Sequence, residues 1–282
     1  MAENPSSDDW ASARGEKWLA QLAGMEAMLA PVDEPLIRAL RLEAPLRIAD
    51  VACGGGGTTL TIAQRAPQGS AVHGFDISPA LIEHARTRVD PDADPISFAC
   101  RNVATEPPPE PPYARLSSRF GVMFFDDPAA AFGNLTRWLA PRGRFAFAVW
   151  GHPAENPWAS SLRQTLAEVI DLPHPDPEAP GPFRYAEADR LLELLDAAGF
   201  VELEVEDWRG ALAIGGGLPA SQAAELALAA FGVAEHLADA DDAAREDVRR
   251  RLTARYTQHL RDGAVYLDAH VHLCTGARPG PA

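Results

Sequence analysis

The chain has 282 residues, of which 46% are hydrophobic and 7% aromatic, and it carries a formal net charge of −15. This length and composition predict one large α/β domain, or a core domain with an elaboration. The acidic balance argues against partners such as nucleic acid or an anionic membrane surface. No apolar run reaches the roughly 18 residues of a transmembrane helix, and the N-terminus does not look like a signal peptide. The cysteines, which number three and lie far apart, fit a cytoplasmic location better than a disulfide framework.

The first predicted elements are helices, and strands begin near residue 47. Residues 10–30 have apolar side chains at helical spacing and predict an amphipathic helix, and a shorter helix is expected over 34–42. Short apolar runs then alternate with helical segments. Strands are expected at residues 47–53, 71–77, 96–102, 114–120 and 143–150. Such alternation predicts a parallel, doubly wound sheet with right-handed crossovers.

The second half of the chain continues this pattern. We expect helices over 156–170 and 185–200, a strand over 201–212, two acidic and alanine-rich helices within 219–261, and a last strand over 264–278. The proline cluster 106–113 takes the place of a helix between the third and fourth strands, and it predicts a rigid extended connection.

Four consecutive glycines, residues 54–57, directly follow the first predicted strand. Glycine loses more backbone entropy on folding than any other residue, so this run needs a reason. Ligands of an open parallel sheet bind at the carboxyl ends of its strands. Asp76, 20 residues beyond Gly56, ends the second strand and is placed to accept hydrogen bonds from both hydroxyls of a ribose. The two features together predict a site for a nucleoside-bearing cofactor rather than a flexible linker.

A nicotinamide dinucleotide is not the only cofactor that this pattern allows. Thr59 occupies the third glycine position of the G-x-G-x-x-G motif. Lys17 is the only lysine, so the chain has no Tyr-x-x-x-Lys pair and no P-loop lysine. Schiff-base chemistry at any other position is excluded for the same reason.

Several stretches resemble the small-molecule branch of the class I S-adenosylmethionine-dependent methyltransferases. They are "ADVACGGGGTTLTIA" (49–63), "GFDISPALIEHAR" (74–86), the long central stretch 117–150, and "ENPW" (155–158). The resemblance runs from about residue 10 to residue 279. It implies a Rossmann-like, seven-stranded α/β sheet whose antiparallel last strand lies beside the sixth. It also implies four segments: an N-terminal helical lid (1–45), a cofactor-binding core (46–215), a helical cap insertion (216–262), and the last core strand with a tail (263–282).

The resemblance assigns the first group of candidate residues to the methionine part and the ribose of S-adenosyl-L-methionine. Asp50 and the backbone of Ala52, Gly54 and Gly56 would surround the methionine part. Asp76 would hold the ribose hydroxyls, as its position after the second strand also predicts.

The second group follows later strands. Ile77 would pack on the adenine, and Asn102 and Val103 would reach the edge of that ring. Ser118 and Arg119, at the end of the fourth strand, would lie near the sulfonium. Two positions depart from the family pattern, which usually has an aspartate where Asn102 stands and an acid where Ala114 stands. An asparagine still accepts through its carbonyl oxygen but lacks the charge.

The lid prediction concerns the helix with Trp10 and Trp18, which is similar to a segment that closes over the cofactor in this family. Trp18 is therefore a candidate cofactor contact, and plain core packing is the alternative for each tryptophan. The helices of 219–261 carry no cofactor signature and are expected to cover the substrate cleft.

Methyl transfer from a sulfonium needs alignment and exclusion of water more than a strict catalytic motif. His152, just past the fifth strand, is our candidate general base for a hydroxyl acceptor, with Glu155 as a substitute; a surface histidine without a catalytic role is the alternative. His270, His272 and Cys274 share one face of the last strand. Metal binding by this row is weighed against simple alternation in a partly exposed strand, and we assign no metal ligand.

Three functions follow as hypotheses. The first is an enzyme that methylates a small molecule, such as a secondary metabolite or a quinone-like acceptor. The second is an S-adenosylmethionine-binding enzyme of the same fold with non-methylating chemistry, and the third is a non-catalytic cofactor-binding protein. The expected partner is a small-molecule substrate, with neither nucleic acid nor membrane, and a homodimer is a candidate assembly.

Overall fold

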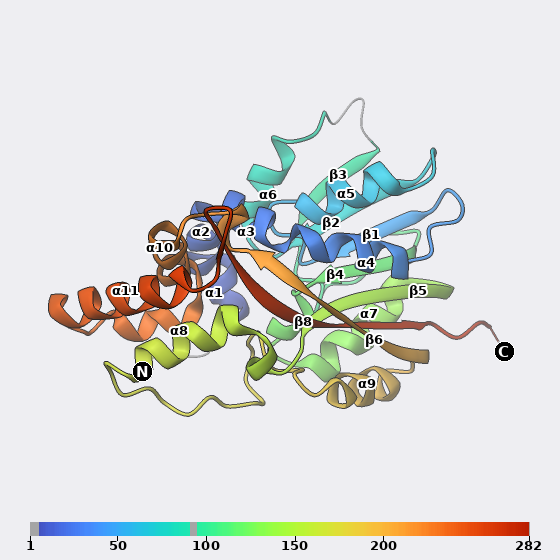
Figure 1. Ribbon diagram of the computed structural model, residues 1–282. Coiled ribbons are helices and arrows are strands. Elements are labelled where there is room, and N and C mark those ends of the chain that lie inside the picture. The colour runs from blue at the N-terminus through green and yellow to red at the C-terminus, as the bar shows by residue number, and fades with distance from the viewer. Residues whose placement is uncertain (1–5, 91–94, 282) are drawn as a thin grey trace.

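The computed structural model describes residues 6–90 and 95–281, and a twisted mixed sheet forms its centre (Figure 1). The strand order is β3-β2-β1-β4-β5-β8-β6. Its strands are β1 (Arg47–Val51), β2 (Ala71–Asp76), β3 (Ile96–Cys100), β4 (Tyr113–Arg119), β5 (Leu139–Trp150), β6 (Val201–Ala213) and β8 (Ala264–Ala277). The strands from β3 to β5 pair in parallel, and β8 lies antiparallel between β5 and β6. The predicted doubly wound sheet with an antiparallel last strand is confirmed.

An eighth, two-residue strand was not expected. β7 (Leu260–Arg261) pairs with the start of β8 as a hairpin. Asp262 and Gly263 form its turn with φ values of 51° and 83°. Asp-Gly is a favoured pair for a two-residue hairpin because both positions need positive φ. The Asp-Gly pair in the sequence indicates such a turn. The strand before it, however, is too short to show the alternating pattern of a strand.

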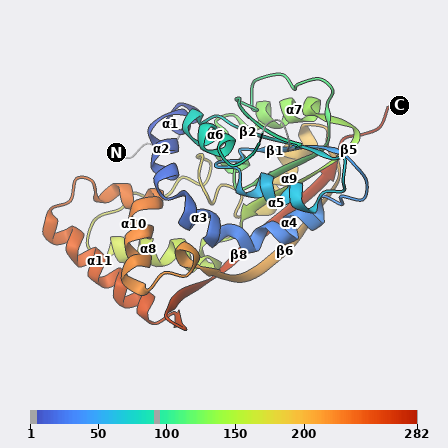
Figure 2. The same ribbon diagram turned by 90° about the horizontal axis from the view of Figure 1, so that it is seen from above.

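Helices cover both faces of the sheet (Figure 2). One face carries α4 (Asp33–Ala39) and α5 (Gly57–Arg65), while α7 (Pro128–Trp138) and α9 (Ala188–Ala197) pack on the other. α6 (Pro79–Arg86) contacts β2 and β3. The predicted start of α6 is observed, because the Ser78 hydroxyl accepts a hydrogen bond from the amide of Leu81 and Pro79 occupies the first turn.

The predicted helix over 10–30 is three shorter helices: α1 (Ser7–Ala11), α2 (Ala13–Ala20) and α3 (Leu22–Leu29). Ser12 leaves the helical conformation at the first break, and its hydroxyl donates to the carbonyl of Asp8. A hydroxyl that bonds a nearby carbonyl competes with the helical backbone, which accounts for this break. α3 then packs its Met25, Met28 and Leu29 into the main core.

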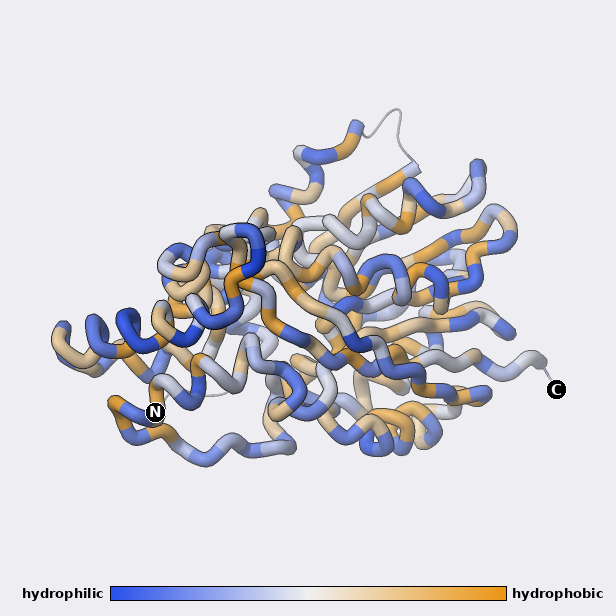
Figure 3. Tube along the Cα trace, viewed as in Figure 1, coloured by the Kyte–Doolittle hydropathy of each residue, from blue (hydrophilic) through white to orange (hydrophobic). Residues whose placement is uncertain are grey.

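The remaining helices gather at one end of the sheet. In both views α8 (Pro157–Ala167), α10 (Ala220–Ala230) and α11 (Asp242–Thr257) lie together, beside α1 and α2. Figure 3 shows many hydrophobic positions along the strands, whereas hydrophilic positions dominate α11. None of the helices within 6–90 and 95–281 is long and apolar enough to cross a membrane. The division into four segments is not tested by this arrangement and stays a prediction.

Candidate cofactor and acceptor site

A cavity of about 1310 Å³ opens at the carboxyl ends of β1, β2, β4 and β5. The strand order reverses between β1 and β4, and the loops that follow these two strands meet there. Open α/β sheets bind ligands at this switch point, because the loops on either side diverge and leave a crevice. The volume exceeds that of a typical pocket for one drug-sized ligand, so it can hold two reactants together.

The glycine run forms the turn from β1 into α5, and three of its members are required by the backbone or by close contacts. Gly54 and Gly56 have φ values of 56° and 87°, which favour glycine. A Cβ on Gly56 would lie 2.7 Å from Phe98, and one on Gly55 would lie 2.3 Å from Leu22. A side chain at either position would displace its neighbour, so the run is a tightly packed loop and not a linker.

The loop is also held by hydrogen bonds from outside. The amide of Gly57 donates to Glu26 of α3 over 3.0 Å. Arg88 donates to the carbonyl of Gly55 over 2.7 Å and to the same Glu26 carboxylate over 2.8 Å. Glu26 of the N-terminal helix α3 therefore holds the glycine loop in place. The sequence patterns did not reveal this contact.

Two strand ends beside the cavity have unusual backbone conformations. Ala52 after β1 has a φ of 55°, and Phe120 after β4 has a φ of 64°. Gly121, directly after Phe120, packs against Ala52, since a Cβ on it would lie 2.3 Å from the Cβ of Ala52. Positive φ in residues with side chains is uncommon and tends to occur at functional sites.

Asp76 lies at the end of β2 with both carboxylate oxygens directed by backbone amides. Gly54 N–H donates to Oδ2 over 2.8 Å, and Ser78 N–H donates to Oδ1 over 2.9 Å. Burial raises the pKa of Asp76, and these hydrogen bonds oppose that effect by favouring the charged form. The two oxygens offer more acceptor positions than these amides use, so the carboxylate can still accept a hydrogen bond from the cavity.

A second buried carboxylate, Asp50, lies beside the glycine loop. Its Oδ2 accepts a hydrogen bond of 2.7 Å from the hydroxyl of Thr59, the residue that replaces the third motif glycine. Burial raises the pKa of Asp50 to about 7. Nearby, Asp33 accepts from Arg119 over 3.0 Å and from the Thr58 hydroxyl over 2.9 Å.

At the end of β3, Asn102 makes hydrogen bonds within a local turn. Its side-chain Oδ1 accepts a hydrogen bond from the backbone amide of Ala104 over 3.0 Å, and its backbone N–H donates to the Glu106 carboxylate over 2.8 Å. Asn102, Val103 and Ile77 nevertheless line the cavity together, next to Asp76. An adenine edge placed there would meet the side-chain amide of Asn102 and the apolar faces of the other two.

The cavity brings together ten of the twelve candidate residues. They are Trp18, Asp50, Ala52, Gly54, Asp76, Ile77, Asn102, Val103, Arg119 and His152. The side chain of Ser118 is instead fully buried, and its hydroxyl donates to the carbonyl of Val51 over 2.9 Å. Ser118 therefore joins β4 to β1, and Gly56 faces Phe98 rather than the cavity.

His152 lies at the cavity wall, and one of its ring nitrogens already accepts a hydrogen bond. Its Nδ1 accepts a hydrogen bond of 3.2 Å from the amide of Ala154. In the neutral ring this places the proton on Nε2, so Nε2 can donate but has no lone pair for a substrate proton. Action as a base through Nε2 requires the other tautomer and the loss of this hydrogen bond.

The N-terminal helices form part of the cavity wall, and they also contact the helical insertion. The indole Nε1 of Trp18 lies 4.0 Å from the position of a Cβ on Gly54, and Trp10 meets the Trp18 ring edge-on at 6.0 Å. Arg14 and Lys17 of α2 both pair with Glu235, which lies between α10 and α11, over 3.0 Å. Both helical additions thus border the cavity.

Aromatic residues that sequence reasoning did not single out line the other half of the cavity. Phe120 stacks on Trp150 at 4.0 Å, and Trp150 lies 4.7 Å from Trp158. Phe183 and Phe231 then flank Trp158 at 5.8 and 5.0 Å. These five rings, hereafter the aromatic wall, come from segments far apart in the chain. Only the positions of Phe120 and Trp150 at strand ends gave a sequence signal.

Arg184 is the buried cation of this half. One guanidinium nitrogen donates to the carbonyl of Phe125, and Nε has no hydrogen-bond partner among the described residues. The proline-rich loop 173–182, which also lines the cavity, leads up to it. A buried arginine with so few partners can bind an oxygen-bearing ligand.

The fold is a Rossmann-like α/β sheet, and its cavity has one half around the glycine loop and Asp76 and a second half that is apolar and aromatic. The family model of a methyltransferase domain matches residues 48–143. A demethylmenaquinone methyltransferase from Thermus thermophilus is 30% identical over 128 residues, 45% of this chain and 58% of that protein. A trans-aconitate 2-methyltransferase from Methylobacterium radiotolerans is 32% identical over 187 residues, 64% of this chain and 66% of that protein.

The chain thus spans about three fifths to two thirds of the length of these two relatives. Among solved structures, the YcgJ protein from Bacillus subtilis is similar in fold, with a TM-score of 0.57, 16% identity, and coverage of 88% of this chain and 98% of that one. A methyltransferase domain thus matches residues 48–143, and the motifs, the relatives and the fold together support the class I S-adenosylmethionine-dependent methyltransferases as the family that the motifs predict.

Proposed function

We propose that this protein binds S-adenosyl-L-methionine in the half of the cavity around the glycine loop and methylates a small organic molecule held on the aromatic wall. The observation that carries the proposal is the single cavity with two unlike halves. One half has a glycine loop and the buried carboxylate Asp76. The other half is apolar and aromatic.

The charges beside the glycine loop suit a cationic ligand. Burial raises the pKa values of Asp33, Asp50 and Asp76, and the pair between Arg119 and Asp33 offsets only part of this cost. A ligand with an ammonium and a sulfonium would stabilise their charged forms. When bound, S-adenosylmethionine supplies a methyl group already activated by positively charged sulfur.

The protein residues then have three tasks in this proposal. Asp76 and the loop orient the cofactor, Trp18 and the helical additions exclude water, and the aromatic wall aligns the acceptor. His152 would take part only for an acceptor whose proton must be removed, and only in its less favoured tautomer.

The chemistry of the wall narrows the acceptor class. A flat, apolar body would pack against rings such as Trp150 and Trp158. An oxygen on that body would accept a hydrogen bond from the guanidinium of Arg184, which lines the cavity. Phenols, quinone-like compounds and aromatic carboxylic acids combine both features.

The expected cytoplasmic location and the expected lack of nucleic-acid binding have indirect support. All three cysteines are free, which suits a cytoplasmic enzyme. The net charge of −15 opposes nucleic-acid binding, and the homodimer stays a prediction for light scattering to test.

The test is incubation of the full chain with methyl-labelled S-adenosylmethionine and a panel of those acceptors. Label in an organic product supports the proposal. Cofactor binding without any transfer would favour a non-catalytic role, and an altered acceptor without label would favour non-methylating chemistry.

A further inference from the structure

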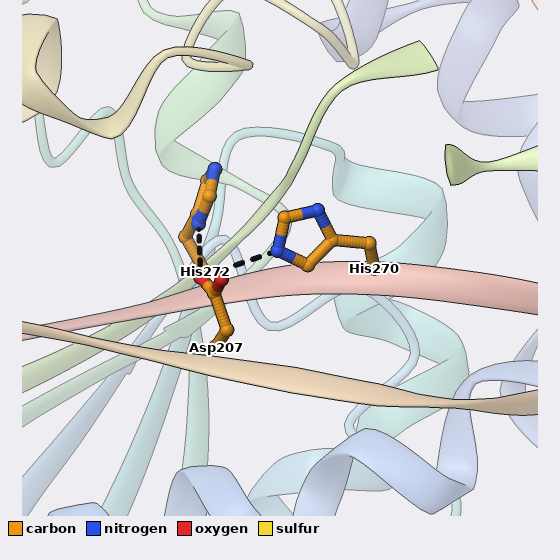
Figure 4. Close-up of side chains that lie close together, drawn as sticks. All are labelled: Asp207, His270 and His272. Carbon is orange, nitrogen blue, oxygen red and sulfur yellow. Dashed lines mark hydrogen bonds and ion pairs between the residues drawn. The ribbon is translucent and has the colours of Figure 1, made fainter. Parts of the chain in front are cut away.

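Two histidines and a carboxylate that the methyl-transfer site does not use meet on the face of strands β6 and β8. The register pairs Asp207 with His272, and His270 lies two residues away on the same side of β8. Figure 4 shows both rings directed at one carboxylate oxygen. Oδ1 of Asp207 is 2.7 Å from Nδ1 of His272 and 3.2 Å from Nε2 of His270.

The other nitrogen of each ring faces an oxygen acceptor. Nε2 of His272 lies 3.0 Å from the carbonyl of Ala186, and Nδ1 of His270 lies 2.8 Å from Oε2 of Glu155. Protons on these two outer nitrogens leave lone pairs on the two inner ones. The carbonyl of Ala186 thus orients His272 as metal-binding histidines are oriented, by an acceptor at the ring nitrogen remote from the metal, whereas Glu155 lies only within ion-pair distance of His270.

His270 adds an independent observation. Its ring is buried, and neither nitrogen makes a well-aligned hydrogen bond with any described residue, although carboxylates lie within ion-pair distance. Buried polar atoms without aligned partners are rare in native proteins and call for an explanation. A ligand between the inner nitrogen and Asp207 would supply one.

We propose that His270 Nε2, His272 Nδ1 and Asp207 Oδ1 bind a divalent transition metal, with zinc as the best match. Two imidazoles and one carboxylate are zinc ligands, and three protein ligands leave a fourth position open. With bonds of about 2.0–2.2 Å, tetrahedral ligand atoms lie roughly 3.3 Å apart. The contact of 3.2 Å already matches, and the one of 2.7 Å needs to widen by a fraction of an ångström.

Arg209 is a cation beside this group, and its contacts are with other oxygens. It pairs with Oε1 of Glu155, and its Nη2 lies 3.7 Å from Oδ2 of Asp207. Oδ1 stays directed at the histidines. The arginine side chain is 55% exposed, so it can move away when a cation binds.

The proposed site lies behind the wall of the large cavity and joins four segments. They are β6, β8, the turn with Glu155, and the segment that contains Ala186. Ala154 and Ala186 also line the cavity. A bound metal would therefore stabilise one wall of the aromatic half of the cavity from behind. It would not contact the half around the glycine loop.

The test is calorimetric titration of the untagged, chelator-treated full chain with zinc sulfate. We expect one equivalent to bind, with affinity lowered more than about 100-fold in His272→Gln and Asp207→Asn and about 10-fold in Glu155→Gln. His259→Ala removes an exposed histidine elsewhere and is the matched control, for which affinity should not change.

Asp207→Asn keeps the shape of a partly exposed side chain, so it tests the site even if a histidine variant fails to fold. Cobalt provides a second readout, because tetrahedral Co²⁺ gives intense visible absorption that these variants should lose. Absence of saturable one-to-one binding would overturn the proposal. So would equal zinc affinity in wild type, Asp207→Asn and His272→Gln. Both results are independent of methyl transfer.

Discussion

Asp76 is a buried carboxylate that the backbone keeps pointed at the cavity. Two amide hydrogen bonds, from Gly54 and Ser78, set its orientation without using all of its lone pairs. The sequence spacing predicted an acid here, but it could not show that the glycine loop itself positions the carboxylate. The loop and the acid are therefore one unit.

Asp76→Ala should weaken binding of S-adenosylmethionine or its demethylated product by roughly 2–4 kcal/mol, because two charge-assisted hydrogen bonds are lost. Calorimetry measures the effect, and Asp196→Ala, at an exposed aspartate on α9, is the control. Affinity that is unchanged in Asp76→Ala would remove the ribose assignment.

Asn102 allows a second test at the same scale. Asn102→Asp keeps an oxygen for the amide of Ala104 and adds a charged acceptor for the adenine amino group. We expect affinity for the cofactor to be kept or improved, as measured by calorimetry. A large loss would show that Asn102 does not face the adenine.

At the scale of elements, the N-terminal helices have two different roles. α3 belongs to the core, since Met25 and Met28 are buried there, and its Glu26 holds the glycine loop. α1 and α2 instead cover the cavity with Trp10 and Trp18. Removal of residues 1–30 would therefore disturb folding, whereas a cut after Ala20 separates the cover from the core.

Deletion of residues 1–20 should leave a folded sheet but weaken cofactor retention and methyl transfer, because water would reach the sulfonium. Trp18→Ala should reproduce part of the loss. Glu16→Ala, an exposed position of the same helix, should behave as wild type. Circular dichroism checks folding, and label transfer checks activity. Full activity in the truncated chain would mean that α1 and α2 are not a lid.

At the scale of the whole molecule, the buried carboxylates couple stability to pH. The pKa of Asp50 is raised to about 7 from 3.8, so between these values the native state holds a proton that the unfolded state has released. Stability from this group therefore falls as pH rises from about 4 to 7, by up to about 1.4 kcal/mol per pH unit, and is level above that range. Burial also raises the pKa values of Asp33 and Asp76, and so acts in the same direction.

Asp50→Asn should therefore gain stability relative to wild type between pH 5 and pH 8, when both are unfolded with urea without ligand. Asp196→Asn, with its exposed side chain, should show no such trend. A constant difference between Asp50→Asn and wild type over this range would show that Asp50 is charged throughout.

Much of the fold was predictable because its signals are local. Alternating apolar runs and helical segments predicted the strands, and the glycine run with Asp76 indicated the part of the sheet edge where the cavity opens. The break at Ser12 and the two-residue strand β7 were missed, since single hydrogen bonds and a two-residue pairing leave no period in a sequence.

Other features depend on contacts that only tertiary structure creates. The register of β8 against β6 brings Asp207 opposite His272, although 65 residues separate them in the chain. The aromatic wall likewise joins Phe120 to Phe231 through rings from distant segments. By itself, the sequence determined the doubly wound core and the glycine–carboxylate unit, because both follow from local pattern and spacing. The tertiary structure decided the aromatic wall, the hydrogen bonds of Asn102 and Ser118, and the position of Asp207 beside the histidine pair, because strand register and loop packing select which distant side chains meet.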